Sequence, residues 1–230
     1  KELIIIISSN KGLCGGYNIN NFKQVASYIK SNPIGSYDYI TIGKKAQDFV
    51  LRTGGNLLTD FSEIIKDSIE ISDTKKISRN LIGIFEEKKY DKIVIFYSYY
   101  ISAIKQKNIV KQFLPINKSD ISEFLESLIG IQSYEIKIDS IIEKKNCTIE
   151  PDKETIIYEV IPMILDLMFY EFLLESKASE HASRMVAMKN AKDSANKKVF
   201  ELTLTYNKAR QTNITKEISE IVTGVESSKN

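Results

Sequence analysis

The most constraining feature of this 230-residue sequence is a long helical pattern that runs from Asp152 to Gly224. No glycine lies between Pro151 and Gly224, and Pro162 is the only proline inside the stretch. Apolar or small residues recur at steps of three or four, which aligns them along one side of a helix. Roughly 70 residues rising about 1.5 Å each predict a rod on the order of 100 Å long. A domain of this size cannot enclose such a rod, so most of it should lie against something outside the fold.

The character of this predicted helix changes along its length. Its apolar side is broad and rich in large apolar residues from Ile156 to Leu174, which we call the apolar segment. From Ala178 to Ala195 the apolar side becomes narrow and rich in Ala, Ser and Met. Small residues let a neighbouring helix approach closely, so we expect coiled-coil-like packing there. Pro162 predicts either a kink or the actual start of the helix.

Charge also changes sign along the predicted helix. Eight basic and two acidic residues lie between Arg184 and Lys216, although the net charge of the whole chain is only +2. Such an arm is either an ordinary solvated helix face or a surface placed against acidic parts of a partner.

The first 150 residues have the pattern of an α/β domain, with apolar strands that alternate with helices. A run of Leu and Ile from Glu2 to Ser9 is typical of a strand buried on both faces of a parallel sheet. This order predicts a Rossmann-like, mostly parallel sheet with right-handed crossovers. Further strands are expected at Tyr37 to Ile42, near Leu57, and at Asp91 to Tyr99, with extended pieces near Ser102 to Leu114 and Ser133 to Ile138. Helices are expected at Ile19 to Ile29, Lys44 to Thr53, Asp73 to Lys88 with Ser72 or Asp73 as N-cap, and Asp120 to Ile129.

The predicted domain boundary therefore lies at Glu150-Pro151, with an α/β domain at 1–150 and the long helix at 151–230. No run of eighteen apolar residues occurs, so no membrane-spanning helix is predicted. Two cysteines are too few for a disulfide framework and indicate a reducing compartment or no redox role.

A glycine-rich turn, Gly12 to Gly16, separates the first strand from the first helix. This position invites a nucleotide-binding hypothesis, but the spacing is that of neither dinucleotide-binding nor triphosphate-binding loops. We therefore favour glycines that make a tight turn with positive φ. Cys14 has no His or Asp neighbour in the turn to activate it, which favours a packed thiol over a nucleophile.

No recognisable catalytic, cofactor or metal site emerges from the sequence. His181 is the only histidine. It has no cysteine or carboxylate cluster at metal-ligand spacing, so we expect a solvent-facing or interface residue. Acidic pairs such as Glu86-Glu87 lie on predicted surface helices, with nothing to mark a general acid and base.

Two long segments of the predicted helix resemble the gamma subunit of F-type ATP synthase. The segment from Ala178 to Lys189 is similar to the family's ASE-x-x-x-RMVAM-K segment, and Leu202 to Gly224 is similar to its C-terminal signature. The turn from Ser8 to Asn18 is similar to the family's S-x-D-R-G-L-C-G-G-x-N motif. The departures are Asn10 for aspartate, Lys11 for arginine, His181 for glutamine and Val225 for alanine.

This resemblance implies a non-catalytic central stalk, or rotor shaft, of a proton-translocating ATP synthase. The implied partners are the alpha and beta subunits, the epsilon (or delta) subunit and the membrane ring of c subunits, with no cofactor and no nucleic acid. Rotation of the c-ring would drive ATP synthesis in the alpha/beta hexamer. The complex would lie peripherally on the inner face of the bacterial plasma membrane or, alternatively, on the matrix side of the mitochondrial inner membrane.

The resemblance also implies roles for matching residues. Contacts to the beta subunit are expected from Arg184, Arg210, Gln211, Thr215, Glu217 and Glu220. A structural turn in the foot domain is expected from Lys11, Gly12, Cys14, Gly15 and Gly16. The family's N-terminal helix would precede Lys1, and we therefore expect an incomplete N-terminus.

Two alternatives of other classes remain at this point. One is a nucleic-acid-binding protein whose basic helical arm contacts phosphates, which would make binding steeply salt-dependent. The other is a nucleotide-dependent enzyme that uses the turn at Gly12 to Gly16.

Overall fold

The computed structural model describes residues 1–33, 36–64, 69–117, 119, 121, 124 and 153–228. Its centre is a sheet with the strand order β3-β2-β1-β4-β5. The strands β1 (Glu2–Ile7), β2 (Tyr37–Ile42), β3 (Asn56–Asp60) and β4 (Lys92–Tyr100) are parallel. The edge strand β5 (Gln106–Leu114) pairs with β4 in antiparallel register. The predicted Rossmann-like, mostly parallel sheet is therefore confirmed.

The central strand β1 explains why the sheet is covered on both faces. All six of its residues are buried. Ile5 pairs in register with Ile40 of β2 on one side and Ile95 of β4 on the other. Because side chains alternate along a strand, Ile5 and its alternate neighbours join one core while Ile4 and Ile6 join a second.

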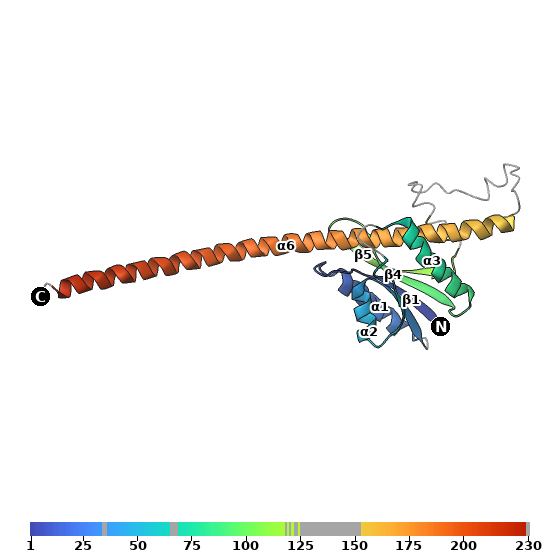
Figure 1. Ribbon diagram of the computed structural model, residues 1–230, viewed down its shortest axis with the longest axis horizontal. Coiled ribbons are helices and arrows are strands. Elements are labelled where there is room, and N and C mark those ends of the chain that lie inside the picture. Colours follow the sequence, from blue (N-terminus) through green and yellow to red (C-terminus); the bar gives the residue numbers. More distant parts are fainter. Residues whose placement is uncertain are drawn as a thin grey trace, which may run out of the picture. The chain divides into compact units, whose positions relative to one another are not determined.

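Helices form a layer on each face of this sheet (Figure 1). The helices α1 (Tyr17–Ser31) and α2 (Lys44–Arg52) cover the face of Ile4 and Ile6, where Val25 and Val50 are fully buried. The opposite face is covered by α3 (Ile71–Glu86) and by the first part of α6. The result is a three-layer α/β arrangement.

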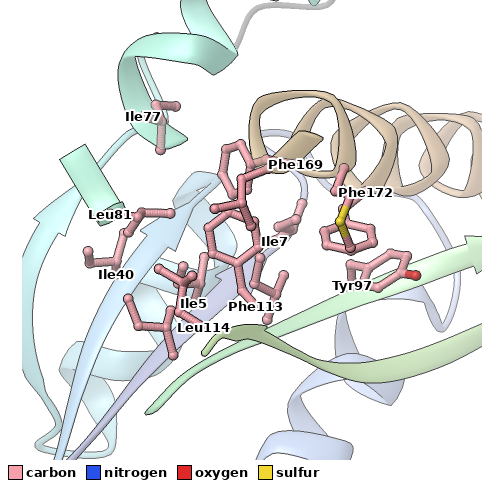
Figure 2. Close-up of a cluster of buried hydrophobic side chains, with 14 of the residues drawn as sticks. Ile5, Ile7, Ile40, Ile77, Leu81, Tyr97, Phe113, Leu114, Phe169 and Phe172 are labelled. Atoms are coloured by element: carbon pink, nitrogen blue, oxygen red, sulfur yellow. The ribbon is translucent and has the colours of Figure 1, made fainter. Parts of the chain in front are cut away.

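The larger core lies between the sheet, α3 and α6 (Figure 2). Ile77 and Leu81 of α3 belong to the same cluster as Ile5 and Ile40 of the sheet, and Leu81 lies beside Ile40. The helix α6 contributes five side chains of its apolar segment, each at most 3 % exposed, namely Leu165, Met168, Phe169, Phe172 and Leu173. Burying side chains of this size contributes about 1.5–3 kcal/mol each, so the start of α6 is an integral part of this core.

The helix α6 extends from Lys153 to Ser227 and contains Pro162. The helix thus begins before the proline, and the interpretation of Pro162 as the helix start was wrong. Two compact units divide the chain, Lys1–Arg184 and Met185–Asn230. The first contains the sheet, its covering helices and the beginning of α6, and the second contains the remainder of α6. The predicted division into 1–150 and 151–230 stays a prediction.

Several element boundaries differ from expectation. The helix α3 begins at Ile71 with Glu70 as its N-cap, and no side chain caps it by a hydrogen bond. The prediction of Ser72 or Asp73 as N-cap was therefore wrong, because the apolar Ile71 already belongs to the first turn. The extended piece expected from Ser102 begins only at Gln106, since the N–H of Lys105 donates to the carbonyl of Ser102 in a turn. The expected helix Asp120 to Ile129, strand Ser133 to Ile138 and Cys147 lie largely or wholly outside the described residues.

Candidate functional site

The glycine turn after β1 is held from within by a network of short polar contacts. The Ser9 Oγ donates to the carbonyl of Lys11 at 2.7 Å, and the Asn18 amide donates to the Ser9 Oγ at 2.8 Å. The same amide lies 3.2 Å from the Cys14 Sγ, and the Cys14 side chain is only 3 % exposed. Cys14 is thus a packed thiol, as predicted.

The turn requires a left-handed backbone at two positions. Gly15 has a φ of 56°, which glycine adopts without steric cost. Leu13 has a φ of 62° and exposes 75 % of its surface. Gly16, at φ −82°, does not have positive φ. The expectation that the glycines of the turn have positive φ is therefore correct for Gly15 and wrong for Gly12 and for Gly16, where the chain already enters α1.

Asn10 connects the turn to two neighbouring segments of the chain. The Asn10 amide donates to the carbonyl of Ser62 at 3.1 Å, and its oxygen accepts from the N–H of Lys44 at 3.0 Å. Asn10, which stands where the resembled motif has aspartate, thus connects the turn to the segment after β3 and to the first residue of α2 by acting as donor and acceptor at once.

The helix α6 contacts the turn through Arg184, which pairs with the buried Glu180 carboxylate of the same helix. Glu180 is only 4 % exposed. Its oxygens lie 2.7 Å from an Arg184 Nη2 and 3.2 Å from the Lys177 Nζ. The Arg184 guanidinium also lies 3.5 Å from the carbonyl oxygens of Lys11 and Gly12. The fold thus brings Arg184 and the turn together, two groups that the sequence treated separately.

Small side chains let α6 come close to the sheet at this level. The Ser179 Oγ donates to the carbonyl of Ser98 at the end of β4 at 2.9 Å. The Ser176 Oγ lies 2.7 Å from the Tyr17 hydroxyl of α1, and burial raises the pKa of Tyr17 while the Ser176 hydrogen bond lowers it. We expected the small residues after Ala178 to receive a neighbouring helix, but Ser179 faces a strand. That expectation was wrong for Ser179, because its small side chain brings α6 close to β4 and donates a hydrogen bond to a backbone carbonyl of that strand.

Little space remains where turn and helix meet. A cavity lined by Asn10, Tyr17, Lys177 and Glu180, among others, has a volume of about 10 Å³. This is about the space of one water molecule. Among the described residues, no group of three or more His, Cys, Asp or Glu side chains is placed to hold a metal ion. None of the helices in the described part of the chain is long and apolar enough to cross a membrane.

Comparisons with known proteins identify the family. A family model described as ATP synthase matches residues 1–227. The ATP synthase gamma chain of Staphylococcus epidermidis is 35 % identical over 222 residues, which cover 96 % of this chain and 71 % of the relative. The gamma chain of Staphylococcus aureus is 33 % identical over 223 residues, with the same coverage. The chain belongs to the ATP synthase gamma chain family.

Solved structures have the same fold as this gamma-chain family member. A chain of the Euglena gracilis mitochondrial ATP synthase in rotational state 3 matches with a TM-score of 0.67 at 21 % identity, covering 98 % of this chain and 72 % of that one. A chain of the Tetrahymena thermophila central stalk and c-ring matches with a TM-score of 0.58 at 22 % identity, covering 84 % and 76 %. The resemblance stated from the sequence is confirmed, and the nucleic-acid-binding alternative gains no support.

The other predicted contact residues of the gamma chain lie in the second unit. All are exposed on α6, namely Arg210, Gln211, Thr215, Glu217 and Glu220. The Thr215 hydroxyl donates to the Gln211 carbonyl at 2.9 Å, and the Glu220 carboxylate lies 3.8 Å from the Lys216 Nζ. Helical spacing places Gln211 and Thr215 on one side and Arg210 and Glu217 on another. His181 is exposed as well, as expected.

Sequence reasoning missed the central member of the site, Glu180. The sequence contains a pattern that indicates its burial, because Ser176, Ser179 and Glu180 continue the apolar positions of the apolar segment at helical spacing. A carboxylate on the inner side of a helix, with cations three before and four after it, is typical of a buried ion-pair network.

Proposed function

We propose that this chain is the non-catalytic rotor shaft of an ATP synthase, with α6 as the shaft and the sheet domain as its foot. The observation that carries the proposal is that a 75-residue helix packs part of its first half, with Leu165, Phe169 and Leu173, into the core of an α/β domain. This arrangement, in a member of the gamma chain family, suits the transmission of rotation better than chemistry.

A shaft needs an anchor that resists both pulling and twisting. The apolar anchor is the set of α6 side chains buried against the sheet, among them Phe169 and Phe172. A polar anchor lies on the α3 side, where the Arg79 guanidinium donates to the buried Asp166 carboxylate at 2.9 and 3.1 Å. Because both anchors are made by α6 side chains packed against other elements, rotation of the helix about its own axis would break them together.

The second unit supplies the surface that meets partners. Most of the large exposed apolar side chains there have half or more of their surface exposed, including Val199, Leu202 and Tyr206 at steps of three and four. We assign contacts with the beta subunit to Arg210, Gln211, Thr215, Glu217 and Glu220, whose side chains project from the same segment. Contact energies that differ between beta conformers would let an asymmetric shaft favour one conformer over another.

Arg184 takes a double role in this proposal. Its side chain is 25 % exposed and already paired with Glu180. It would hold the turn at residues 11–16 against α6 while offering its remaining donors to the beta subunit. A guanidinium has five N–H donors, which is enough for both tasks.

The remaining partners follow from the family. We assign the foot domain to contacts with the epsilon (or delta) subunit and the ring of c subunits. The Staphylococcus relatives favour the cytoplasmic face of a bacterial plasma membrane, with the matrix side of the mitochondrial inner membrane as the alternative.

The decisive experiment is reconstitution with alpha and beta subunits, followed by measurement of rotation driven by ATP. We expect co-purification, and we expect Arg210→Ala with Gln211→Ala to weaken rotation or assembly without unfolding the chain. The matched control is Lys75→Ala with Asn80→Ala, which removes an exposed cation and an exposed amide from α3. Unchanged rotation in the first variant would refute the contact assignment, and failure to co-purify would refute the proposed function.

A further inference from the structure

A cavity of about 230 Å³ lies beside the contact of α6 with the strands β4 and β5 and is lined by residues of all three. Tyr97 of β4 and Phe172 of α6 form one wall, with ring centroids 4.7 Å apart (Figure 2). Two acidic residues of α6, Glu171 and Glu175, lie on the same side of the helix and line the cavity. The anchor of α6 thus contains a pocket that is aromatic on one wall and acidic on another.

Glu175 is the titratable centre of this pocket. Desolvation raises the pKa of its carboxyl most, and repulsion from Glu171 raises it further. A hydrogen bond from the Tyr97 hydroxyl and the positive charge of Lys111 on β5 lower it, and the net pKa is about 7. The burial and the geometry of the cavity therefore put the charge change of Glu175 near neutral pH.

Each described element around the cavity contributes groups that bear on this carboxyl. The strand β4 contributes the Tyr97 hydroxyl and lines the cavity with Tyr99, β5 contributes Lys111, and α6 itself contributes Glu171. A protonated Glu175 can sit against the aromatic wall with little desolvation cost, whereas an ionised one adds a second negative charge beside Glu171.

We propose that this pocket is a proton-sensitive contact, which holds α6 more firmly on β4 and β5 at acidic pH than at alkaline pH. The folded chain retains the Glu175 proton up to a higher pH than the unfolded chain does. Stability contributed by the neutral carboxyl is therefore full below the unfolded value of 4.5, falls as pH rises, and is lost above about 7. In a rotor this would tie the stiffness of the shaft's anchor to the pH of its compartment.

The test is hydrogen exchange of the full-length chain at about pH 5.5 and about pH 8, corrected for intrinsic exchange rates. We expect protection of the α6 peptides around Glu175 to fall on the order of tenfold between the two conditions, which allows for the partial exposure of the carboxyl. Glu175→Gln, which imitates the neutral carboxyl, should keep the high protection at both.

Two further variants make the test specific. Glu171→Gln removes the neighbouring charge and should move the loss of protection to lower pH. Glu159→Gln changes an exposed carboxylate of the same helix and should behave like the unchanged chain. The proposal fails if Glu175→Gln keeps the pH dependence, if the unchanged chain has none, or if Glu175→Gln does not fold.

Discussion

At the scale of single residues, burial distinguishes the ion pairs that stabilise the foot domain from those that contribute little to its stability. Glu180 holds two cations in a place where water hardly reaches, whereas the Glu87 carboxylate meets Lys89 with both side chains more than half exposed. Removing one partner of a buried ion pair leaves charges without compensation, while exposed pairs contribute little.

We therefore predict that Glu180→Ala lowers the free energy of unfolding by about 2–4 kcal/mol, which is less than a fully buried pair would give because Arg184 is partly exposed. The matched change Glu87→Ala should cost less than about 1 kcal/mol. Urea unfolding of the two variants measures the difference, and equal midpoints would contradict the assignment of Glu180 as the centre of the network.

The turn gives a second residue-scale prediction. A β-carbon at Gly15 would force a side chain into the left-handed region, at a cost of about 1–2 kcal/mol. A β-carbon at Gly12 would meet no atom within 4 Å. Gly15→Ala should thus lower the melting temperature measurably, and Gly12→Ala should leave it nearly unchanged in the same calorimetric scan.

At the scale of elements, the helix α6 is anchored by a few aromatic side chains. Phe169 is fully buried in the core, and Phe200 on the same helix is 66 % exposed. Phe169→Ala should cost about 3–5 kcal/mol through the cavity that it leaves. Phe200→Ala should stay within about 0.5 kcal/mol, as surface changes usually do. Denaturant midpoints of the isolated chain decide this, and a large loss in the second variant would show that Phe200 is not a surface residue of the free chain.

The elements differ in how far their sequences determine them. The apolar run of β1 and the apolar spacing along α6 predicted a buried parallel strand and a long helix, because burial of both faces of a strand and of one side of a helix each leaves a strong pattern. The antiparallel direction of β5 and the cap of α3 escaped prediction, since pairing partners and terminal turns depend on distant residues. The contact of Arg184 with the turn joins positions more than 170 apart in sequence, and spacing within α6 cannot reveal it.

At the scale of the whole molecule, the two units differ in what stabilises them. The unit Lys1–Arg184 has its own two cores, whereas the described part of the second unit is helix as far as Ser227 and exposes most of its large apolar side chains. Helical propensity alone gives marginal stability in water, and most helices rely on packing.

We predict that amides of the second unit exchange rapidly in the isolated chain and become protected once alpha and beta subunits are added. Amides of β1 should remain protected in both states, which supplies an internal control. Hydrogen exchange followed by mass spectrometry reads both units at once. Equal protection of the second unit before and after assembly would mean that the partners do not enclose it.

Asn10 has a consequence that reaches beyond its own position. A carboxylate there could still accept the Lys44 N–H, but it would place a lone pair opposite the Ser62 carbonyl, where the amide now donates. The side chain at position 10 is thus a donor that matches the acceptor of the backbone at residue 62. A chain with aspartate at position 10 must also reorient the peptide group of residue 62, or place a proton or a cation between the carboxylate and the Ser62 carbonyl.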